Sequence, residues 1–201
     1  MIKDLNKKLY FYSMFDGCLQ IKEHGNANLI INMLEINEDY IEMVIKTLEE
    51  IPLGYTKTLP AIYTKDGFNR KQQIRLQTKV HPILTKIHER IYLEGRKVVD
   101  PHMLTLLDAE ALAIAFMADG SRYVDKRWPN ASPKYRLHTN NLSYGDNWLF
   151  KKALKETLNL EFNIVKKGTK YELGLRQSDS KIFEQLIEPF ILPSFKYKIG
   201  R

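Results

Sequence analysis

The chain has 201 residues, of which 44% are hydrophobic and 27% charged, so it can form one or two domains with a real core and wholesale disorder is excluded. Its single cysteine, Cys18, excludes an intramolecular disulfide and with it a secreted disulfide scaffold. The formal net charge of +7 favours a polyanionic partner such as nucleic acid, with a membrane surface as the weaker alternative.

The first part of the chain predicts the order helix, two strands, helix, two strands, helix. A helix over residues 4–15 ends at Asp16-Gly17, and strand-like alternation follows in "CLQIK" and "ANLIINML". A helix from about Asn37 to Glu50 comes next. Two strands then flank the turn "KDGF", in which Asp66-Gly67 is a strong hairpin signal. A helix over Val80 to Leu93 completes this half.

The second part of the chain predicts the same order again. A helix over Asp108 to Ala118 ends at Asp119-Gly120, and strands are expected in "RYV" and "KYRLHTN". A helix from about Asp146 to Leu158 leads to a hairpin around "KKGT", and a last helix covers about Ser178 to Glu188. We therefore expect an α+β protein of two pseudo-symmetric αββαββα halves, residues 1–100 and 101–201, with antiparallel sheets.

Each Asp-Gly pair has two interpretations. Glycine is favoured just past a helix end and aspartate tolerates the cap region, so the pair can be a helix terminator and nothing more. A carboxylate there faces the negative end of the helix dipole, however, at a cost of roughly 0.3–1 kcal/mol. A bound cation would remove that cost. Because Asp16 and Asp119 occupy the same point of the two halves, a metal site is the functional interpretation.

Two segments of the second half resemble a known family. The segment "LTLLDAEALAIAFMADGS" is similar to the motif of LAGLIDADG homing endonucleases, and the closing "LIEPFILPSFKYKIG" is similar to the family's terminal segment. The first copy, "LYFYSMFDGCL", matches through its repeat position and its Asp-Gly ending, and has Phe11 and Phe15 where the family usually has small residues at the contact between the motif helices. The resemblance covers nearly the whole chain and indicates the single-chain type with two motif copies.

The resemblance implies an active site at the ends of the two motif helices, packed at the centre of the molecule. The last acid of each motif, Asp16 or Asp119, would hold Mg²⁺, with two or more divalent ions in all, and the backbone carbonyls of Phe15 and Ala118 would bind the same ions. The family places an active-site lysine at Lys198, and Lys97 closes the first half in the same way. A solvated lysine is the alternative for both, and Arg96 is an alternative to Lys97.

Polar side chains alternate with apolar ones along the predicted strands, so one face of each sheet can meet DNA while the other packs on helices. A hydrated face without a partner is the alternative. The residues expected on the DNA face are Gln20, Lys22, Asn32, Lys71, Gln73, Arg75, Gln77, Lys134, Arg136, His138, Asn140 and Arg176.

The function that the resemblance implies is that of a site-specific, Mg²⁺-dependent double-strand DNA endonuclease of intron homing, a monomer whose sheets form a saddle over a long asymmetric target. Two alternatives remain open, an RNA-binding intron maturase of the same fold and a DNA-binding protein that has lost cleavage. No signal-peptide pattern or membrane span is evident, so we expect an intracellular, soluble protein. The sequence does not indicate its compartment.

Overall fold

The structure is a computed structural model that describes residues 2–51, 53–60, 71–124, 127 and 132–201. It divides into two compact units, residues 1–89 with 192–194 and residues 90–191 with 195–201. The expected hairpin turn at Asp66-Gly67 lies outside the described residues. Within the described part of the chain, no helix combines the length and the apolar character needed to cross a membrane.

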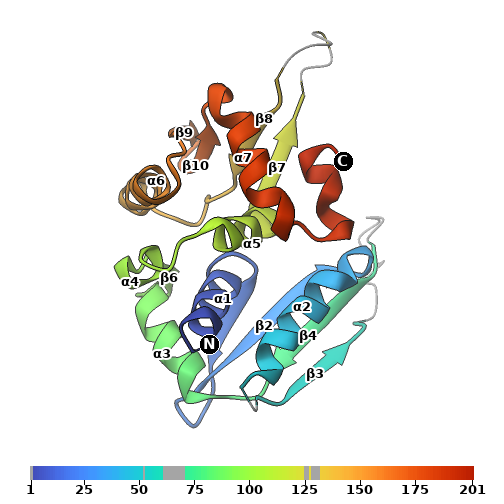
Figure 1. Cartoon of the computed structure of the whole chain (residues 1–201). Coiled ribbons are helices and arrows are strands. Elements are labelled where there is room, and N and C mark those ends of the chain that lie inside the picture. Colours follow the sequence, from blue (N-terminus) through green and yellow to red (C-terminus); the bar gives the residue numbers. More distant parts are fainter. Residues whose placement is uncertain (1, 52, 61–70, 125–126, 128–131) are drawn as a thin grey trace. The chain divides into compact units, whose positions relative to one another are not determined.

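The first unit has the expected αββαββα order (Figure 1). Its elements are α1 (Ile2–Phe15), β1 (Gly17–Ile21), β2 (Ala27–Leu34), α2 (Glu38–Glu49), β3 (Tyr55–Thr58), β4 (Gln73–Thr78) and α3 (Pro82–Ile91), the last of which continues into the second unit. The strands form an antiparallel sheet in the order β1-β2-β4-β3. Helices α1 and α2 pack against the sheet and bury its apolar face, to which Leu29, Ile31 and Leu76 contribute.

The second unit repeats this order after a short lead-in made of β5 (Tyr92–Leu93), β6 (Arg96–Lys97) and α4 (Pro101–Leu104). It continues with α5 (Ala109–Asp119), β7 (Gly120–Tyr123), β8 (Lys134–Leu137), α6 (Tyr144–Leu158), β9 (Phe162–Lys167), β10 (Lys170–Leu175) and α7 (Ser180–Ile187). The antiparallel sheet has the order β7-β8-β10-β9, the counterpart of the first sheet. The predicted duplication of an α+β unit is therefore confirmed.

Helix α5 is the most buried helix of the second unit. Every residue from Ala111 to Met117 is at most 1% exposed, which explains why the segment is apolar on all sides. The ring of Phe116 packs edge-on against Tyr135 of β8 and Phe183 of α7, so that the helix joins the sheet to its covering helix. The end of α5, where Asp119 lies, is thereby held in place by the core.

Two sequence expectations differ from the structure, and one element was not expected. The helix expected to reach Leu93 ends at Ile91, because Tyr92–Leu93 pairs with Arg96–Lys97 around a turn in which Glu94 and Gly95 both have left-handed φ values of 51° and 77°. Strand β8 ends at Leu137, short of the expected "HTN". A 3-10 helix at Pro193–Ile199, which contains Lys198, was not expected.

Candidate functional site

Asp119 is the last residue of α5, and its carboxyl group is half-buried. Burial raises the pKa of this carboxyl above its ordinary value, while the positive charges of Lys97, Lys198 and His138 act in the opposite direction. Three groups that carry or can carry positive charge therefore lie within electrostatic reach of one carboxylate. Desolvation combined with such neighbours, at the end of a helix, is typical of a functional site.

Lys198 lies against the end of α5. Its Nζ donates a hydrogen bond to the carbonyl oxygen of Met117 at 2.6 Å and a longer one to that of Phe116 at 3.4 Å. The carbonyl groups in the last turn of a helix carry partial negative charge, so the ammonium group stabilises this end of α5. Lys198 is therefore bound to the helix end, in contrast to the solvated lysine that was the alternative from the sequence.

Lys97 is half-buried in β6, where it pairs with Tyr92. Its charge lowers the pKa of Asp119, whereas Arg96 is exposed and is not among the groups that influence that carboxyl. The sequence left Lys97 and Arg96 as alternatives, and Lys97 is the one that lies near Asp119 in the structure.

The glycine after each acid is required by space. A Cβ added to Gly120 would lie 2.1 Å from Cδ2 and 2.4 Å from the carbonyl oxygen of Phe116, and one added to Gly17 would lie 2.9 Å from the carbonyl oxygen of Tyr12. Gly120 has φ −93° and ψ 151°, which is extended, and Gly17 has no positive φ. The left-handed cap that usually explains glycine here is therefore absent, and the glycine instead lets the strand start directly against its helix.

Asp16 occupies the corresponding point of the first unit, between Phe15, the last residue of α1, and the first residue of β1. Its backbone N–H donates to the carbonyl of Tyr12 at 3.2 Å, which extends the helical hydrogen bonding by one residue, and its side chain is half-buried. The bulky residues of this motif pack on each other, since the rings of Phe11 and Phe15 stack at 6.0 Å.

The oxygen atoms available at Asp16 and Asp119 suit a metal ion that is held partly by the protein and partly by the substrate. Among the described residues, no three side chains of the types His, Cys, Asp and Glu gather as a metal site. Mg²⁺ in proteins is often held by one or two carboxylates together with substrate phosphates and water. A single aspartate at a helix end, with lysines beside it in the second unit, suits such an arrangement better than a closed protein cage.

The first sheet presents a polar face on the side away from its helices. Asn32 pairs with Arg75, and Ile30 pairs with Gln77, while Ile31 and Leu76 between them are buried. The alternation expected from the sequence is therefore present in β4. In β2, every residue from Ala27 to Ile31 is buried, and Asn32 is the exposed residue of this face. The residues of this face or at its strand ends are Gln20, Lys22, Asn32, Lys71, Gln73, Arg75 and Gln77, all exposed or half-buried, with Lys71 preceding β4 and Lys22 following β1.

The second sheet shows the same alternation only in part. Lys134 and Arg136 are exposed in β8, while Tyr135 and Leu137 are buried. His138 and Asn140 lie beyond the end of the strand, and both are half-buried. Arg176, which follows β10, is exposed.

Glu172 of β10 organises the polar face of the second sheet. Its carboxylate is fully buried and accepts hydrogen bonds from Nη1 of Arg136 at 2.5 Å and from Nδ1 of His138 at 3.0 Å, with Nζ of Lys167 at 3.6 Å. The other ring nitrogen of His138 lies 2.8 Å from Oγ of Ser121. No sequence signal marked Glu172 as the acid that holds Arg136 and His138.

The two sheets carry opposite charges at equivalent positions. Ile31 of β2 pairs with Gly17 and Leu76, and Leu137 of β8 pairs in the same way with Gly120 and Leu173. Leu76 and Leu173 are therefore equivalent positions. Arg75 and Glu172, which precede them by one residue, are equivalent as well. The side chain of Arg75 has no hydrogen bond or ion pair within the described part of the chain, whereas Glu172 has Arg136, His138 and Lys167 as partners.

The chain is similar to known proteins over nearly all its length. The model of the LAGLIDADG DNA endonuclease family matches residues 14–183. The cytochrome b mRNA maturase bI2 of Debaryomyces hansenii is 28% identical over 98% of this chain and 74% of its own length, and the probable intron-encoded endonuclease 1 of Wickerhamomyces canadensis is 25% identical over 87% and 74%. The structure of the homing endonuclease I-WcaI bound to its DNA recognition sequence has a TM-score of 0.85 at 22% identity, over 98% of this chain and 86% of that one.

Proposed function

Because this chain belongs to the LAGLIDADG DNA endonuclease family, we propose that it cleaves both strands of duplex DNA at a long, asymmetric target. The observation that carries the proposal is the environment of Asp119, a half-buried carboxylate at a helix end with Lys97, Lys198 and His138 around it. Phosphodiester hydrolysis requires a metal-binding oxygen and positive charge beside the developing negative charge, and this site offers both. Asp16 supplies the equivalent carboxylate in the first half.

We propose that Asp16 and Asp119 hold two or more divalent ions, with Mg²⁺ as the working metal and the backbone carbonyls of Phe15 and Ala118 as further ligands. When bound, such an ion lowers the pKa of its water and stabilises charge on the phosphoryl oxygens. Lys198, held by the carbonyls of α5, keeps an ammonium group beside Asp119, where it can bind a phosphate oxygen. Lys97 adds a second positive charge to the same site.

The polar faces of the two sheets are proposed to read the DNA, each half contacting one half-site in a saddle. Arginine, lysine, glutamine and asparagine are the side-chain types that pair with base edges in the major groove, and they dominate both faces. Arg75 and Glu172 occupy equivalent positions, but Glu172 is buried and holds Arg136 and His138, so the two faces present different side chains. This difference favours two different half-sites, hence an asymmetric target. A single chain carries both halves, so a monomer is sufficient.

Asp119→Asn and Asp16→Asn test the proposal. Each change keeps the shape of the side chain and removes the charge that holds a divalent ion. We expect each variant to lose double-strand cleavage and to retain specific binding within about tenfold. Cleavage of a randomised duplex library with Mg²⁺, followed by sequencing of the ends, would first supply the target.

The matched control for these variants is Asp108→Asn, because Asp108 is an aspartate at the other end of the same helix. Its Oδ1 accepts a hydrogen bond from the backbone of Ala111 at 2.9 Å, so its removal affects the helix cap and leaves the charge at the cleavage end intact. We expect Asp108→Asn to cleave. Full cleavage by Asp16→Asn would show that the first motif is only a helix end, and full cleavage by Asp119→Asn would overturn the proposed site.

A maturase that helps an intron RNA to fold is the second candidate function, because two similar relatives carry that name. Duplex RNA presents a deep, narrow major groove that side chains cannot read as they read DNA. We propose tighter binding to a target DNA duplex than to a folded RNA. Tighter binding to an intron RNA, unaffected by Asp119→Asn, would favour the maturase, whereas specific DNA binding without cleavage in Mg²⁺ would indicate a DNA-binding protein that has lost cleavage.

A further inference from the structure

Asn28 of β2 is a buried amide whose hydrogen-bonding capacity is not used inside the protein. Its side chain is 1% exposed, and within the described residues neither its oxygen nor its nitrogen has a hydrogen-bond partner. A buried amide that makes no hydrogen bond destabilises the folded state relative to an apolar side chain of similar size. The stability of the free protein therefore does not explain an asparagine at this position.

The face of the sheet on which Asn28 lies is the polar one. Asn28 pairs with the exposed Gln20 of β1, and residues two apart along a strand share a face, so Asn28 lies on the same face as Ile30 and Asn32. Asn32 pairs with Arg75, which carries the face across to β4. Asn28 is thus on the side proposed to meet DNA.

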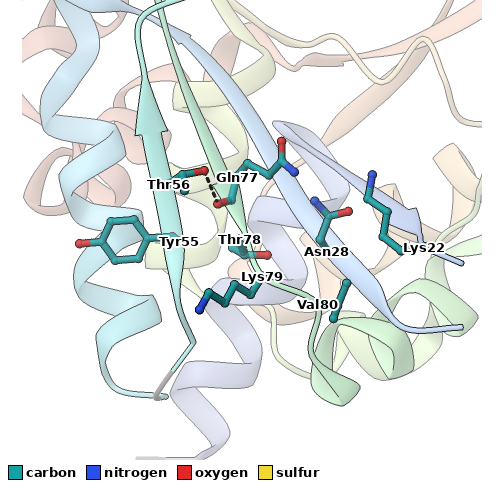
Figure 2. A pocket seen from close by; sticks show the side chains of 8 residues that line it. All are labelled: Lys22, Asn28, Tyr55, Thr56, Gln77, Thr78, Lys79 and Val80. Carbon is teal, nitrogen blue, oxygen red and sulfur yellow. Dashed lines mark hydrogen bonds between the residues drawn. The ribbon is translucent and has the colours of Figure 1, made fainter. Parts of the chain in front are cut away.

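Asn28 lines a shallow groove of about 390 Å³ together with Lys22, Thr56 and Gln77. Figure 2 shows its amide between the side chains of Gln77 and Lys22, and all three extend from the same side of the sheet. The Nζ of Lys22 donates to Oε1 of Gln20 at 3.0 Å, an exposed contact. Lys22 and Gln77 on either side of the amide have long, flexible side chains, which can turn aside when a ligand enters the groove.

We propose that Asn28 reads an adenine in the half-site contacted by the first unit, an inference that rests on the proposed DNA endonuclease function. An asparagine amide offers one donor and one acceptor side by side. These match the N7 acceptor and the N6 donor on the major-groove edge of adenine, and no other base presents that pair in the same way. Lys22 and Gln77 flank the contact and hold the adjacent phosphate or base.

Asn28→Leu and Asn28→Asp test this assignment in complementary ways. Binding to duplexes in which each target base pair is replaced in turn is measured in Ca²⁺ without Mg²⁺, so that cleavage does not interfere. We expect Asn28→Leu to lose the adenine preference at one position, with affinity for the target lowered about 5- to 150-fold. Asn28→Asp should move the preference at that position toward cytosine, because a carboxylate accepts from the cytosine amino group.

The melting temperature of the free variants separates reading from folding. Asn28→Leu removes an unsatisfied amide, so we expect a melting temperature equal to or above that of the unaltered protein. Asn32→Leu, on the same strand and face, is the matched control and should alter the preference at a different base pair.

Asn28→Leu with unchanged preference at every position, or with affinity lowered equally for all sequences, would overturn the inference while leaving the endonuclease intact. Failure of the unaltered protein to discriminate among duplexes would overturn both.

Discussion

Glu172 shows how one buried acid can arrange a basic surface. Without partners, a carboxylate removed from water would be strongly destabilising, but Arg136 and His138 donate hydrogen bonds to it and Lys167 lies nearby. The ion pair holds the guanidinium of Arg136 in one place on the sheet before DNA arrives. If Arg136 contacts DNA as proposed, fewer of its side-chain conformations are lost on binding, which favours affinity and sharpens the geometry of base contacts.

Glu172→Gln tests the contribution of this acid to stability. Burial would raise the pKa of Glu172, but the hydrogen bonds from His138 and Arg136 and the nearby charges outweigh it, and the pKa lies below its ordinary value. A carboxyl with a lowered pKa in the folded state contributes stability that is present above about pH 4.3 and is lost as the pH falls through the folded-state pKa. We expect Glu172→Gln to lower the free energy of unfolding by about 1–3 kcal/mol at about pH 7 and by less at about pH 3. Urea denaturation at the two pH values measures both differences.

The control for Glu172→Gln is Glu156→Gln, which removes a carboxylate from an exposed pair with Lys152 on α6. Exposed pairs of this kind contribute little, so the free energy of unfolding should change by no more than about 0.5 kcal/mol. A difference between the unaltered protein and Glu172→Gln that stays constant between the two pH values would show that the charge of Glu172 plays no part.

At the scale of the elements, the junction of α5 and β7 determines where the acid lies. The strand begins at Gly120, directly after Asp119, and the backbone N–H of His138 donates to the carbonyl of Asp119 at 2.8 Å. The end of α5, the start of β7 and His138, which follows β8, therefore meet at Asp119. The glycine makes this possible because any larger residue would collide with Phe116.

Gly120→Ala is expected to destabilise the protein by about 1–3 kcal/mol, because the added methyl group forces the strand away from the helix. Cleavage should fall as well, since the carboxylate of Asp119 moves with the junction. Thermal unfolding and a cleavage assay with Mg²⁺ measure the two effects. In Gly145→Ala, the added Cβ meets only Oγ of Ser143 at 3.7 Å, and this control should unfold within about 1 kcal/mol of the unaltered protein. Equal stability of both variants would contradict the close approach at Gly120.

At the scale of the whole molecule, duplication supplies two similar frameworks with different surfaces. Strand order and register are equivalent in the two sheets, and each places an aspartate just before its first strand. The side chains on the polar faces differ, as Arg75 and Glu172 show. Equivalent frameworks with unlike faces suit a target whose two half-sites have different sequences.

The net charge of +7 predicts a steep salt dependence of DNA binding. If the polar faces contact six or more phosphates, affinity should fall about a thousandfold or more between about 50 and about 200 mM monovalent salt. Lys71→Ala should reduce the slope of log affinity against log salt by about one if Lys71 contacts a phosphate. Asn32→Leu carries no charge change and should leave the slope as it is, and a slope near zero for the unaltered protein would contradict an electrostatic DNA interface.

The repeated order of helices and strands could be read from the sequence because it depends on local patterns. The 3.6-residue period of α2, the alternation in β4 and the Asp-Gly pairs at the two helix ends involve residues close together in the chain. The positions of Asp16 and Asp119 follow from the same patterns. Small departures, such as the early end of the third helix at Ile91, arose where a short strand pair competed with helical periodicity.

Contacts between distant segments were decided only by the tertiary structure. Lys97 rather than Arg96 lies near Asp119, Lys198 binds the carbonyls of α5, and Glu172 is buried under Arg136 and His138. Each of these contacts joins residues that are more than twenty positions apart, and hydrophobic periodicity carries no information about which side chains then meet. The unsatisfied amide of Asn28 is of the same kind, because burial and the absence of a partner emerge only when neighbouring strands are in register.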